Sequence, residues 1–291
     1  MKAAVRSTTV SSKTKTSVPK TSKRGGASRP KTHAPRKRFG QNFLTDQGVI
    51  SAIARAINPH KEDNVVEIGP GQGALTDALF ESGCAIKAIE IDRDLQSQLR
   101  VMFFNRDFTL FNSDALQFDF NELSDGNHDL RIVGNLPYNI STPLIFKLLT
   151  HLPIIRDMHF MLQKEVVDRL AARPGNKHWG RLSVMTQVDC DVEHLFDVPP
   201  EAFYPQPKVQ SAIVRLTPKM TSHRPECSRE ELGKLVQLAF AQRRKTLRNN
   251  LRGFFDDSVM QRLGIDPACR AETLTLDQLM DLSLELPRAA I

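Results

Sequence analysis

The fold is decided by the stretch Glu67-Ile68-Gly69-Pro70-Gly71-Gln72-Gly73. It continues the short apolar run 65–68, which predicts a buried strand, and it leads into a helical pattern over 73–82. A glycine turn between a strand and a helix lets the backbone approach a nucleotide or nucleoside closely. A plain tight turn is the alternative interpretation.

On both sides of this turn, from Ala52 onward, short β-branched runs alternate with helical patterns. This alternation is typical of an α/β fold with a doubly wound parallel sheet. We expect seven strands, at 65–68, 85–91, 109–112, 131–134, 158–162, 183–189 and 211–216. Helices are expected between them, at 73–82, 94–102, 142–150 and 165–172.

The pattern changes near residue 217. Thr217-Pro218 and the polar stretch up to Ser228 indicate a linker. Only helical patterns follow, at 230–251, 258–263 and 276–284, with Gly253 and Gly264 as expected stops. The sequence therefore predicts an α/β domain over 36–217 and a small α-helical domain over 218–291.

Acidic residues stand at the ends of the second and third predicted strands. Glu90 lies 21 residues after Gly69, where a carboxylate can accept hydrogen bonds from both ribose hydroxyls. Asp114 stands where an acid can accept a hydrogen bond from an adenine amino group. The spacing G-x-G-x-G, with Glu90 in place, favours a nucleoside over a dinucleotide. Alternatively, both carboxylates cap the helices that follow them.

The fourth predicted strand runs into Asn135-Leu136-Pro137-Tyr138. An exocyclic base amine is a poor nucleophile because its lone pair is delocalised, so an enzyme that alkylates it must accept the amine hydrogens. The side-chain carbonyl of Asn135 and the backbone carbonyl of Leu136 are suitable acceptors. Pro137 shapes the turn, and the ring of Tyr138 can stack on an extruded base with about 1–3 kcal/mol. A turn with a packed tyrosine is the alternative.

Positive charge is concentrated at the N-terminus. The formal net charge is +7, but residues 1–38 hold 12 Lys and Arg and no acid, whereas 39–291 hold 28 basic and 33 acidic residues. Residues 1–35 are predicted to be a disordered basic tail. It could bind a phosphate backbone through counterion release. A passive solubilising extension and an organellar transit peptide are the alternatives.

Cysteine spacing and hydropathy predict a cytoplasmic protein without a metal or a membrane partner. The four cysteines are far apart, and no His stands at zinc-ligand spacing. We find no apolar run of about 18 residues and no secretory signal core.

Taken together, five motifs resemble the small-subunit (16S) rRNA adenine N6,N6-dimethyltransferases, the bacterial family linked to kasugamycin sensitivity. The motifs are RFGQNFL at 38–44, EIGPG at 67–71, EID at 90–92, GNLPYNI at 134–140 and FYPQPKV at 203–209. The resemblance runs from about Arg36 to about Asp281. It implies a class I, Rossmann-like methyltransferase domain with a helical C-terminal domain. It also implies that S-adenosylmethionine donates two methyl groups to N6 of each of two adjacent adenosines in the 3′-terminal hairpin loop of 16S rRNA.

The resemblance also implies roles for particular residues. The cofactor would be bound by residues of the segment that folds over it, of the glycine turn and of the strand ends: Asn42, Leu44, Gly69, Gly71, Glu90, Asp114 and Asn135. The target adenine would be held by Asn135, Leu136, Pro137, Tyr138 and a second aromatic face, Phe203. Without the resemblance, Phe203 could equally be a loop anchor packed on the core. The long basic tail departs from a typical bacterial member, and the family assigns it no role.

A basic cluster in the C-terminal part is expected to contact rRNA. On a helix over 230–251, Arg244, Arg248 and Arg252 would share one face, with Arg243 and Lys245 beside them. Like charges stacked in this way destabilise a helix unless an anion faces them, although a solvated face is the common alternative.

The expected function is dimethylation of 16S rRNA by a monomeric enzyme that acts on the small subunit or its precursor. Two other functions are alternatives. One is a large-subunit rRNA adenine methylase, which has the same chemistry. The other is a non-catalytic RNA-binding assembly or transcription factor with the same fold. Asn135-Leu136-Pro137-Tyr138 argues against the factor, because a pure binder has no need for acceptors that orient an amine.

Overall fold

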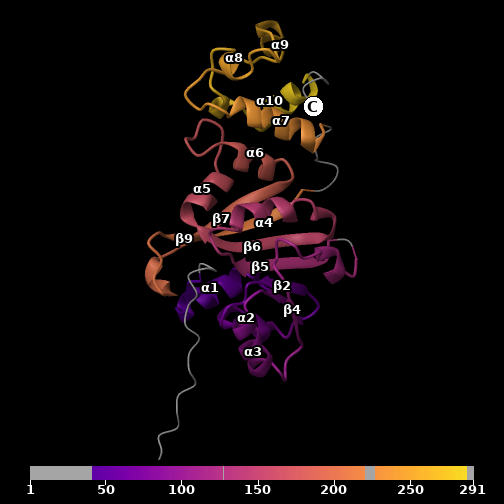
Figure 1. Ribbon diagram of the computed structural model, residues 1–291, viewed down its shortest axis with the longest axis vertical. Coiled ribbons are helices and arrows are strands. Elements are labelled where there is room, and N and C mark those ends of the chain that lie inside the picture. Colours follow the sequence, from indigo (N-terminus) through magenta and orange to yellow (C-terminus); the bar gives the residue numbers. More distant parts are fainter. Residues whose placement is uncertain (1–40, 127, 220–226, 287–291) are drawn as a thin grey trace, which may run out of the picture. The chain divides into compact units, whose positions relative to one another are not determined.

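A seven-stranded sheet forms the centre of the protein (Figure 1). The computed structural model describes residues 41–126, 128–219 and 227–286, so the predicted tail and most of the predicted linker lie outside the described residues. The strands, in the order in which they lie across the sheet, are β4 (Phe108–Asn112), β3 (Ile86–Glu90), β2 (Asn64–Ile68), β5 (Leu130–Asn135), β6 (Ile155–Gln163), β9 (Ser211–Pro218) and β7 (Cys190–Val198).

Helices cover both faces of this sheet. Alternate residues of a strand point to opposite faces, and β2 shows the result. Val65 packs with α1 (Gln47–Ile57), α2 (Ala74–Leu79) and α3 (Arg93–Met102). Val66 packs with η3 (Phe120–Leu123), α4 (Ser141–Leu148) and α5 (Lys164–Leu170). Short 3₁₀ turns complete the connections, at η2 (Phe80–Ser82), η4 (Leu152–Ile154) and η5 (Pro200–Ala202).

The strand order reverses between β2 and β5. From β2 the chain continues to β3 and β4 on one side, and it then returns to place β5 on the other side. In open α/β sheets, ligands bind outside the carboxyl ends of the strands at such a point. Gly134 brings the two strand ends together, because a Cβ added there would lie 2.6 Å from the backbone oxygen of Ile68.

A buried ion-pair network connects α1 to the amino ends of β5 and β6. The guanidinium of Arg131 lies 2.7 Å from Asp63 and 2.9 Å from Asp157, and it also donates to the backbone carbonyls of Ile57 and Asn58. Burial alone would raise the pKa values of both carboxyls, but their hydrogen bonds and the charge of Arg131 bring these pKa values below the ordinary one. The network stands at the sheet edge away from the strand ends that bind ligands.

Six of the seven predicted strands are confirmed, and the expectation at 183–189 is wrong. That segment lies in α6 (Arg181–Gln187), and the seventh strand is β7, which begins at Cys190. The side chain of Ser183 accepts from the backbone of Gly180 at the start of α6, as a helix N-terminus requires. The sheet is parallel from β4 to β6, as expected, but β9 departs from the expected parallel pattern because it runs antiparallel to β6 and to β7.

Three elements had no clear signal in the sequence. One is α1, which covers the sheet with Ile50, Ile53 and Ile57. The others are two-residue strands, β1 (Phe43–Leu44) and β8 (Phe203–Tyr204), which pair with each other outside the main sheet. Their pairing depends on contacts between residues far apart in the chain, which local patterns do not report.

The C-terminal helices share a core of their own with α6. They are α7 (Arg229–Ala239), α8 (Leu247–Asn250), α9 (Asp257–Arg262) and α10 (Leu276–Leu284), with η7 (Ala271–Thr273) between the last two. The only tryptophan of the chain, Trp179, is buried in this core with Met185 and Leu235. The domain boundary at 217/218 stays a prediction.

The expected continuous helix over 230–251 is wrong. The helix α7 ends at Ala239, and α8 begins only at Leu247. The side-chain amide of Asn250 donates to the carbonyls of Ala239 and Gln242, which supplies partners for groups that a helix end leaves open. The turn also buries Leu247 and Leu251 completely.

Candidate functional site

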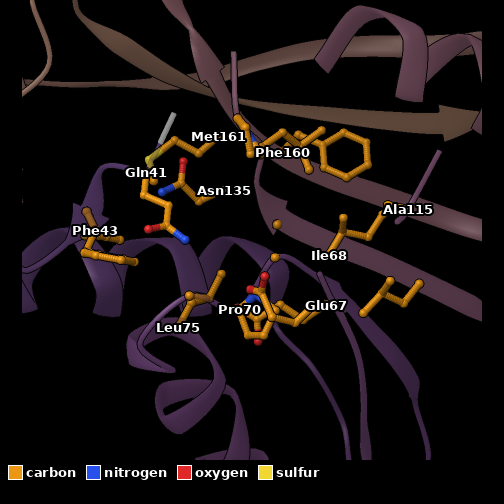
Figure 2. A pocket seen from close by; sticks show the side chains of 18 of the residues that line it. Gln41, Phe43, Glu67, Ile68, Pro70, Leu75, Ala115, Asn135, Phe160 and Met161 are labelled. Carbon is orange, nitrogen blue, oxygen red and sulfur yellow. The ribbon is translucent and has the colours of Figure 1, made fainter. Parts of the chain in front are cut away.

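A cavity of about 290 Å³ lies at the point where the strand order reverses. Its walls come from the carboxyl ends of β2, β3 and β5, from the segment 41–44 and from β6. Figure 2 shows Asn135 with Gln41 and Met161 on one side of the cavity, and Glu67 beside Pro70 on another. Of the predicted cofactor and base residues, those that line it are Asn42, Leu44, Gly69, Gly71, Glu90, Asp114, Asn135, Leu136, Pro137 and Tyr138.

The glycine turn leaves room for a ligand next to its backbone. Gly69 has a φ of +66° and a backbone N–H that donates to Ile89 at 2.9 Å, and a Cβ added at Gly69 would meet nothing within 4 Å. A Cβ at Gly71 would instead lie 3.2 Å from the ring of Phe43. A side chain at either position would occupy this space, and the positive φ angles are unfavourable for residues other than glycine. Both positions therefore require glycine.

The carboxylate of Glu90 is buried at the end of β3 and faces the cavity. Burial raises its pKa, although hydrogen bonds from backbone N–H groups, including that of Asp92, oppose the shift. Asp92, and not Glu90, caps α3. The capping interpretation of Glu90 is therefore wrong, and the residue lies in the cavity wall.

Asp114 has a local structural role as well as a place in the cavity wall. One of its carboxylate oxygens accepts from the backbone N–H of Leu116 at 2.9 Å. The turn that it stabilises follows β4. Both interpretations of this residue are thus compatible with the geometry.

Glu67 is a cavity residue that we did not single out from the sequence. It is fully buried, and Thr76 donates a hydrogen bond of 2.5 Å to its carboxylate. Burial raises the pKa of Glu67 to about 7, the hydrogen bond from Thr76 opposes the rise, and the charge of Glu90 adds to it. The signal available in the sequence was an acidic residue inside an otherwise apolar strand.

Asn135 is fixed by its contact with the segment that covers the cavity. Its side-chain Nδ2 donates to the backbone carbonyl of Asn42 at 3.1 Å. With the amide nitrogen committed in this way, the Oδ1 atom is the part of the side chain left to accept hydrogen bonds. Leu136 follows with its side chain buried in the core and its backbone N–H bonded to the carbonyl of Met161 at 3.2 Å.

The turn after Asn135 holds an aromatic ring against the cavity. The carbonyl of Pro137 accepts from the N–H of Ile140 at 3.1 Å. The hydroxyl of Tyr138 lies 3.1 Å from the Oγ atom of Ser211 on β9, and its backbone carbonyl accepts from Ser141. Because its hydroxyl is anchored, the ring of Tyr138 has a defined position in the cavity wall.

Phe203 does not line this cavity. It is buried among Leu44, Val133 and Ile213, in the core on the α1 face of the sheet. The structure therefore describes the loop anchor that we considered as an alternative, and the role of Phe203 as a second aromatic face stays a prediction. Its neighbour Tyr204 is the exposed aromatic residue of β8.

The predicted RNA-binding residues lie on a turn and a short helix, so the expected stacking of Arg244, Arg248 and Arg252 on one helix face is wrong. Arg243 contacts Glu272 at 3.4 Å, and Arg248 contacts Asp257 at 2.6 Å. The remaining three cations are exposed and form no ion pair with the described residues; they are Arg244, Lys245 and Arg252.

The residues of the cavity fit a nucleoside that carries a charged amino-acid portion. The space beside Gly69 admits a group close to the backbone, and the buried carboxyl groups of Glu67 and Glu90 supply hydrogen-bond acceptors. The described part of the chain shows no group of three or more side chains able to hold a metal ion. None of its helices combines the length and the apolarity needed to cross a membrane.

A mostly parallel sheet with this order of strands and a glycine turn after β2 is the architecture of the class I methyltransferases, which use S-adenosylmethionine. The comparisons with known proteins specify the family. The sequence profile of the family described as ribosomal RNA adenine dimethylase matches residues 32–287, and the chain belongs to this family.

Individual relatives are similar over most of the chain. A protein of Saccharophagus degradans named ribosomal RNA small subunit methyltransferase A is 57% identical over 252 residues, which cover 86% of this chain and 94% of the relative. The protein of the same name from Pseudomonas aeruginosa is 53% identical over 255 residues, with 87% and 95% covered.

Solved structures give the same result for the fold. A dimethyladenosine transferase from Plasmodium falciparum superposes with a TM-score of 0.73 at 27% identity, with 83% of this chain and 96% of that chain covered. The 23S rRNA methyltransferase ErmE superposes with a TM-score of 0.66 at 25% identity, with 84% and 99% covered.

Proposed function

We propose that this enzyme transfers methyl groups from S-adenosylmethionine to N6 of two adjacent adenosines in the 3′-terminal hairpin loop of 16S rRNA. The observation that carries the proposal is that Asn135-Leu136-Pro137-Tyr138 lines the same cavity as the glycine turn at Gly69. A single cavity would thus provide both a nucleoside site and acceptors for a base amine. The names of the most similar relatives supply the small-subunit substrate.

The cofactor would be held by residues from three strand ends. The backbone at Gly69 would face its amino-acid portion, Glu90 its ribose and Asp114 its adenine, and Asn42 and Leu44 would close over it. When bound, S-adenosylmethionine supplies an electrophilic methyl group on a sulfonium whose leaving group is a neutral thioether.

The target amine would be oriented by carbonyl oxygens. The Oδ1 atom of Asn135 and the backbone carbonyl of Leu136 accept the two amine hydrogens, which directs the nitrogen lone pair toward the methyl group. The ring of Tyr138 stacks on the extruded adenine. The amine proton is lost to water after transfer, so positioning contributes more to the rate than a strong base does.

In this proposal the chain acts as a monomer in the cytoplasm, on the small subunit or its precursor. Residues 36–217 form the domain that binds S-adenosylmethionine, and residues 218–291 form the domain that contacts rRNA. The exposed cations Arg244, Lys245 and Arg252 support the second assignment, because nothing within the described residues neutralises them.

Two alternatives are less well supported. The first is a large-subunit rRNA methylase. ErmE is named as a 23S rRNA methyltransferase, but its sequence identity to this chain is 25%, whereas the relatives named as small-subunit enzymes are more than 50% identical. A non-catalytic RNA-binding factor would not need the side-chain amide of Asn135 held by the carbonyl of Asn42.

The test is methyl transfer to small subunits that lack the modification. Purified protein and labelled S-adenosylmethionine should yield N6,N6-dimethyladenosine at two adjacent positions of 16S rRNA, identified by nuclease digestion and mass spectrometry. Large subunits serve as the matched substrate control. Label on 23S rRNA alone, or no label despite measurable cofactor binding, would overturn the proposal.

A further inference from the structure

Tyr204 is an aromatic side chain that the fold leaves in solvent. The chain has two tyrosines, and the other one, Tyr138, is anchored in the cavity wall. Tyr204 is 67% exposed, although its neighbour Phe203 on the same two-residue strand is buried. Large rings are usually covered by the protein itself, so an exposed ring next to a functional site points to a ligand.

The register of β1 with β8 places Tyr204 on the side of the cavity. Phe43 pairs with Tyr204, and Leu44 pairs with Phe203. Cross-strand partners point to the same face of a sheet, and successive residues point to opposite faces. Leu44 and Phe203 share the core face, so Phe43 and Tyr204 share the other face. Both residues of β1 line the cavity, with Phe43 next to Gly71, so the pairing of Tyr204 with Phe43 is what brings Tyr204 close to the cavity wall.

The chain that follows Tyr204 returns directly to the base-binding motif. Residues 205–210 connect it to Ser211, whose hydroxyl lies 3.1 Å from the hydroxyl of Tyr138. In this loop Lys208 and Val209 are exposed, and Lys208 forms no ion pair within the described part of the chain. Tyr204 and the loop after it thus present an exposed ring and an exposed ammonium group on a segment that is linked to cavity residues at both ends, to Phe43 by the β1–β8 pairing and to Tyr138 through Ser211.

An exposed ring and an exposed cation four residues apart in the chain are features suited to binding a single-stranded segment. The ring stacks on the base, whatever its identity, and the cation pairs with the backbone phosphate. Extraction of the target adenine into the cavity breaks its stack with the neighbouring base and leaves one face of that neighbour exposed. That face needs a new partner outside the cavity.

We propose that Tyr204 stacks on the nucleotide next to the adenosine being methylated, and that Lys208 pairs with a phosphate of the same segment. The inference rests on the proposed function, because only an RNA substrate with an extracted base leaves such a neighbour. The target adenine itself would stack on Tyr138, inside the cavity. Tyr204 is thus a substrate-contacting residue outside the cavity.

The first experiment measures kinetics on immature small subunits with the full chain. Tyr204→Ala should lower kcat/KM by about 5- to 150-fold, the range that the usual strength of base stacking gives. The loss should appear in KM, because stacking outside the cavity stabilises the bound substrate and the transition state equally. Tyr204→Phe should stay within about threefold of the wild type, since it keeps the ring.

Phe104→Ala is the matched control. Phe104 is 77% exposed and lies between α3 and β4, at the amino edge of the sheet and so away from the cavity. This variant should leave kcat/KM unchanged within about twofold. Lys208→Gln should reduce the slope of log KM against log salt by about one, as expected for one lost phosphate contact. Calorimetry with S-adenosylmethionine should give unchanged affinity for all four variants, which also shows that they fold.

The second experiment identifies the contact. A photoreactive benzoylphenylalanine at position 204 should cross-link to the nucleotide on either side of the methylated adenosine, and the same group at position 104 should not. Cross-links to a ribosomal protein alone would overturn the inference.

The outcomes separate the two proposals. If the wild type methylates 16S rRNA and Tyr204→Ala equals it in KM, the inference fails and the proposed function stands. If the wild type does not methylate small subunits, the proposed function fails first.

Discussion

At the scale of single residues, Asn135 is the side chain on which the proposed chemistry depends most. Its amide nitrogen is already bonded to the carbonyl of Asn42, so its oxygen is the atom free to orient an incoming amine. Its contribution should therefore appear in the transition state more than in cofactor binding.

Asn135→Ala should abolish methyl transfer and leave the affinity for S-adenosylmethionine within about tenfold, because a lost transition-state contact lowers turnover more than binding. Single-turnover assays and calorimetry measure the two quantities. Asn121→Ala is the control, since Asn121 is exposed and contacts only Asp119 through its side chain. Loss of cofactor binding in Asn135→Ala would show that Asn135 is mainly a cofactor residue.

Glu67 gives a prediction about pH. Its pKa is raised from 4.5 to about 7 in the folded protein, so between these values the folded state holds a proton that the unfolded state has lost. The free energy of unfolding must then fall as pH rises from about 4.5 to about 7, and this group accounts for a decrease of about 3 kcal/mol. Above pH 7 its contribution is constant.

Glu67→Gln should remove this component while keeping an acceptor for Thr76. Urea denaturation at pH 5 and pH 8 should show a smaller loss of stability for the variant than for the wild type. Glu62→Gln, at an exposed position, should behave as the wild type does. Equal pH dependence in all three proteins would contradict the raised pKa of Glu67.

At the scale of elements, the amino ends of β5 and β6 depend on one buried cation. Arg131→Met would leave the carboxylates of Asp63 and Asp157 without their guanidinium, so we expect a loss of about 3–5 kcal/mol of stability. Arg156→Met is a matched control, because Arg156 contacts the same Asp63 at 2.9 Å but is 53% exposed, and its loss should cost at most about 1 kcal/mol. Thermal denaturation of both variants measures these losses. Equal losses of stability in Arg131→Met and Arg156→Met would contradict the prediction.

Most elements of the sheet could be predicted because the strands β2 to β6 and the helices α2 to α5 each have their own period in the sequence. The segment 183–189 could not, since Val184, Met185 and Val188 have the β-branched and apolar character of a strand but bury against α7 as a helix. The antiparallel direction of β9 has no local signal at all. It follows from how the chain returns to the sheet.

The site shows the same division. Gly69, Glu90 and Asn135 stand at strand ends, and the topology brings strand ends together, so their meeting in one cavity was predictable. The burial of Phe203 in the core could not be predicted, because its pairing with Leu44 joins residues 159 positions apart. The break between α7 and α8, which separates Arg244 from Arg248, could not be predicted either. It is accompanied by the hydrogen bond from Asn250 to the carbonyl of Ala239, which joins residues 11 positions apart.

At the scale of the whole molecule, charge is unevenly divided. Residues 1–38 carry 12 basic and no acidic residues, whereas the remainder has five more acids than bases. Specific recognition is assigned here to the cavity and to the exposed cations near α8, so the tail should contribute affinity without selectivity.

Deletion of residues 1–35 should therefore lower the affinity for small subunits and flatten its dependence on salt, because fewer counterions are released on binding. The ratio of products at the two adenosines should stay the same. Titrations at several salt concentrations test this, and an unchanged slope would leave the tail as a passive extension.

The lone tryptophan offers a way to observe one part of the molecule separately. Trp179 is buried between α6 and the C-terminal helices, far in sequence from the cavity residues, and the chain has no second indole. Its fluorescence spectrum should shift to the red only when those helices detach from α6. The protein thus carries an intrinsic optical probe of its C-terminal packing, which needs no label and is independent of catalysis.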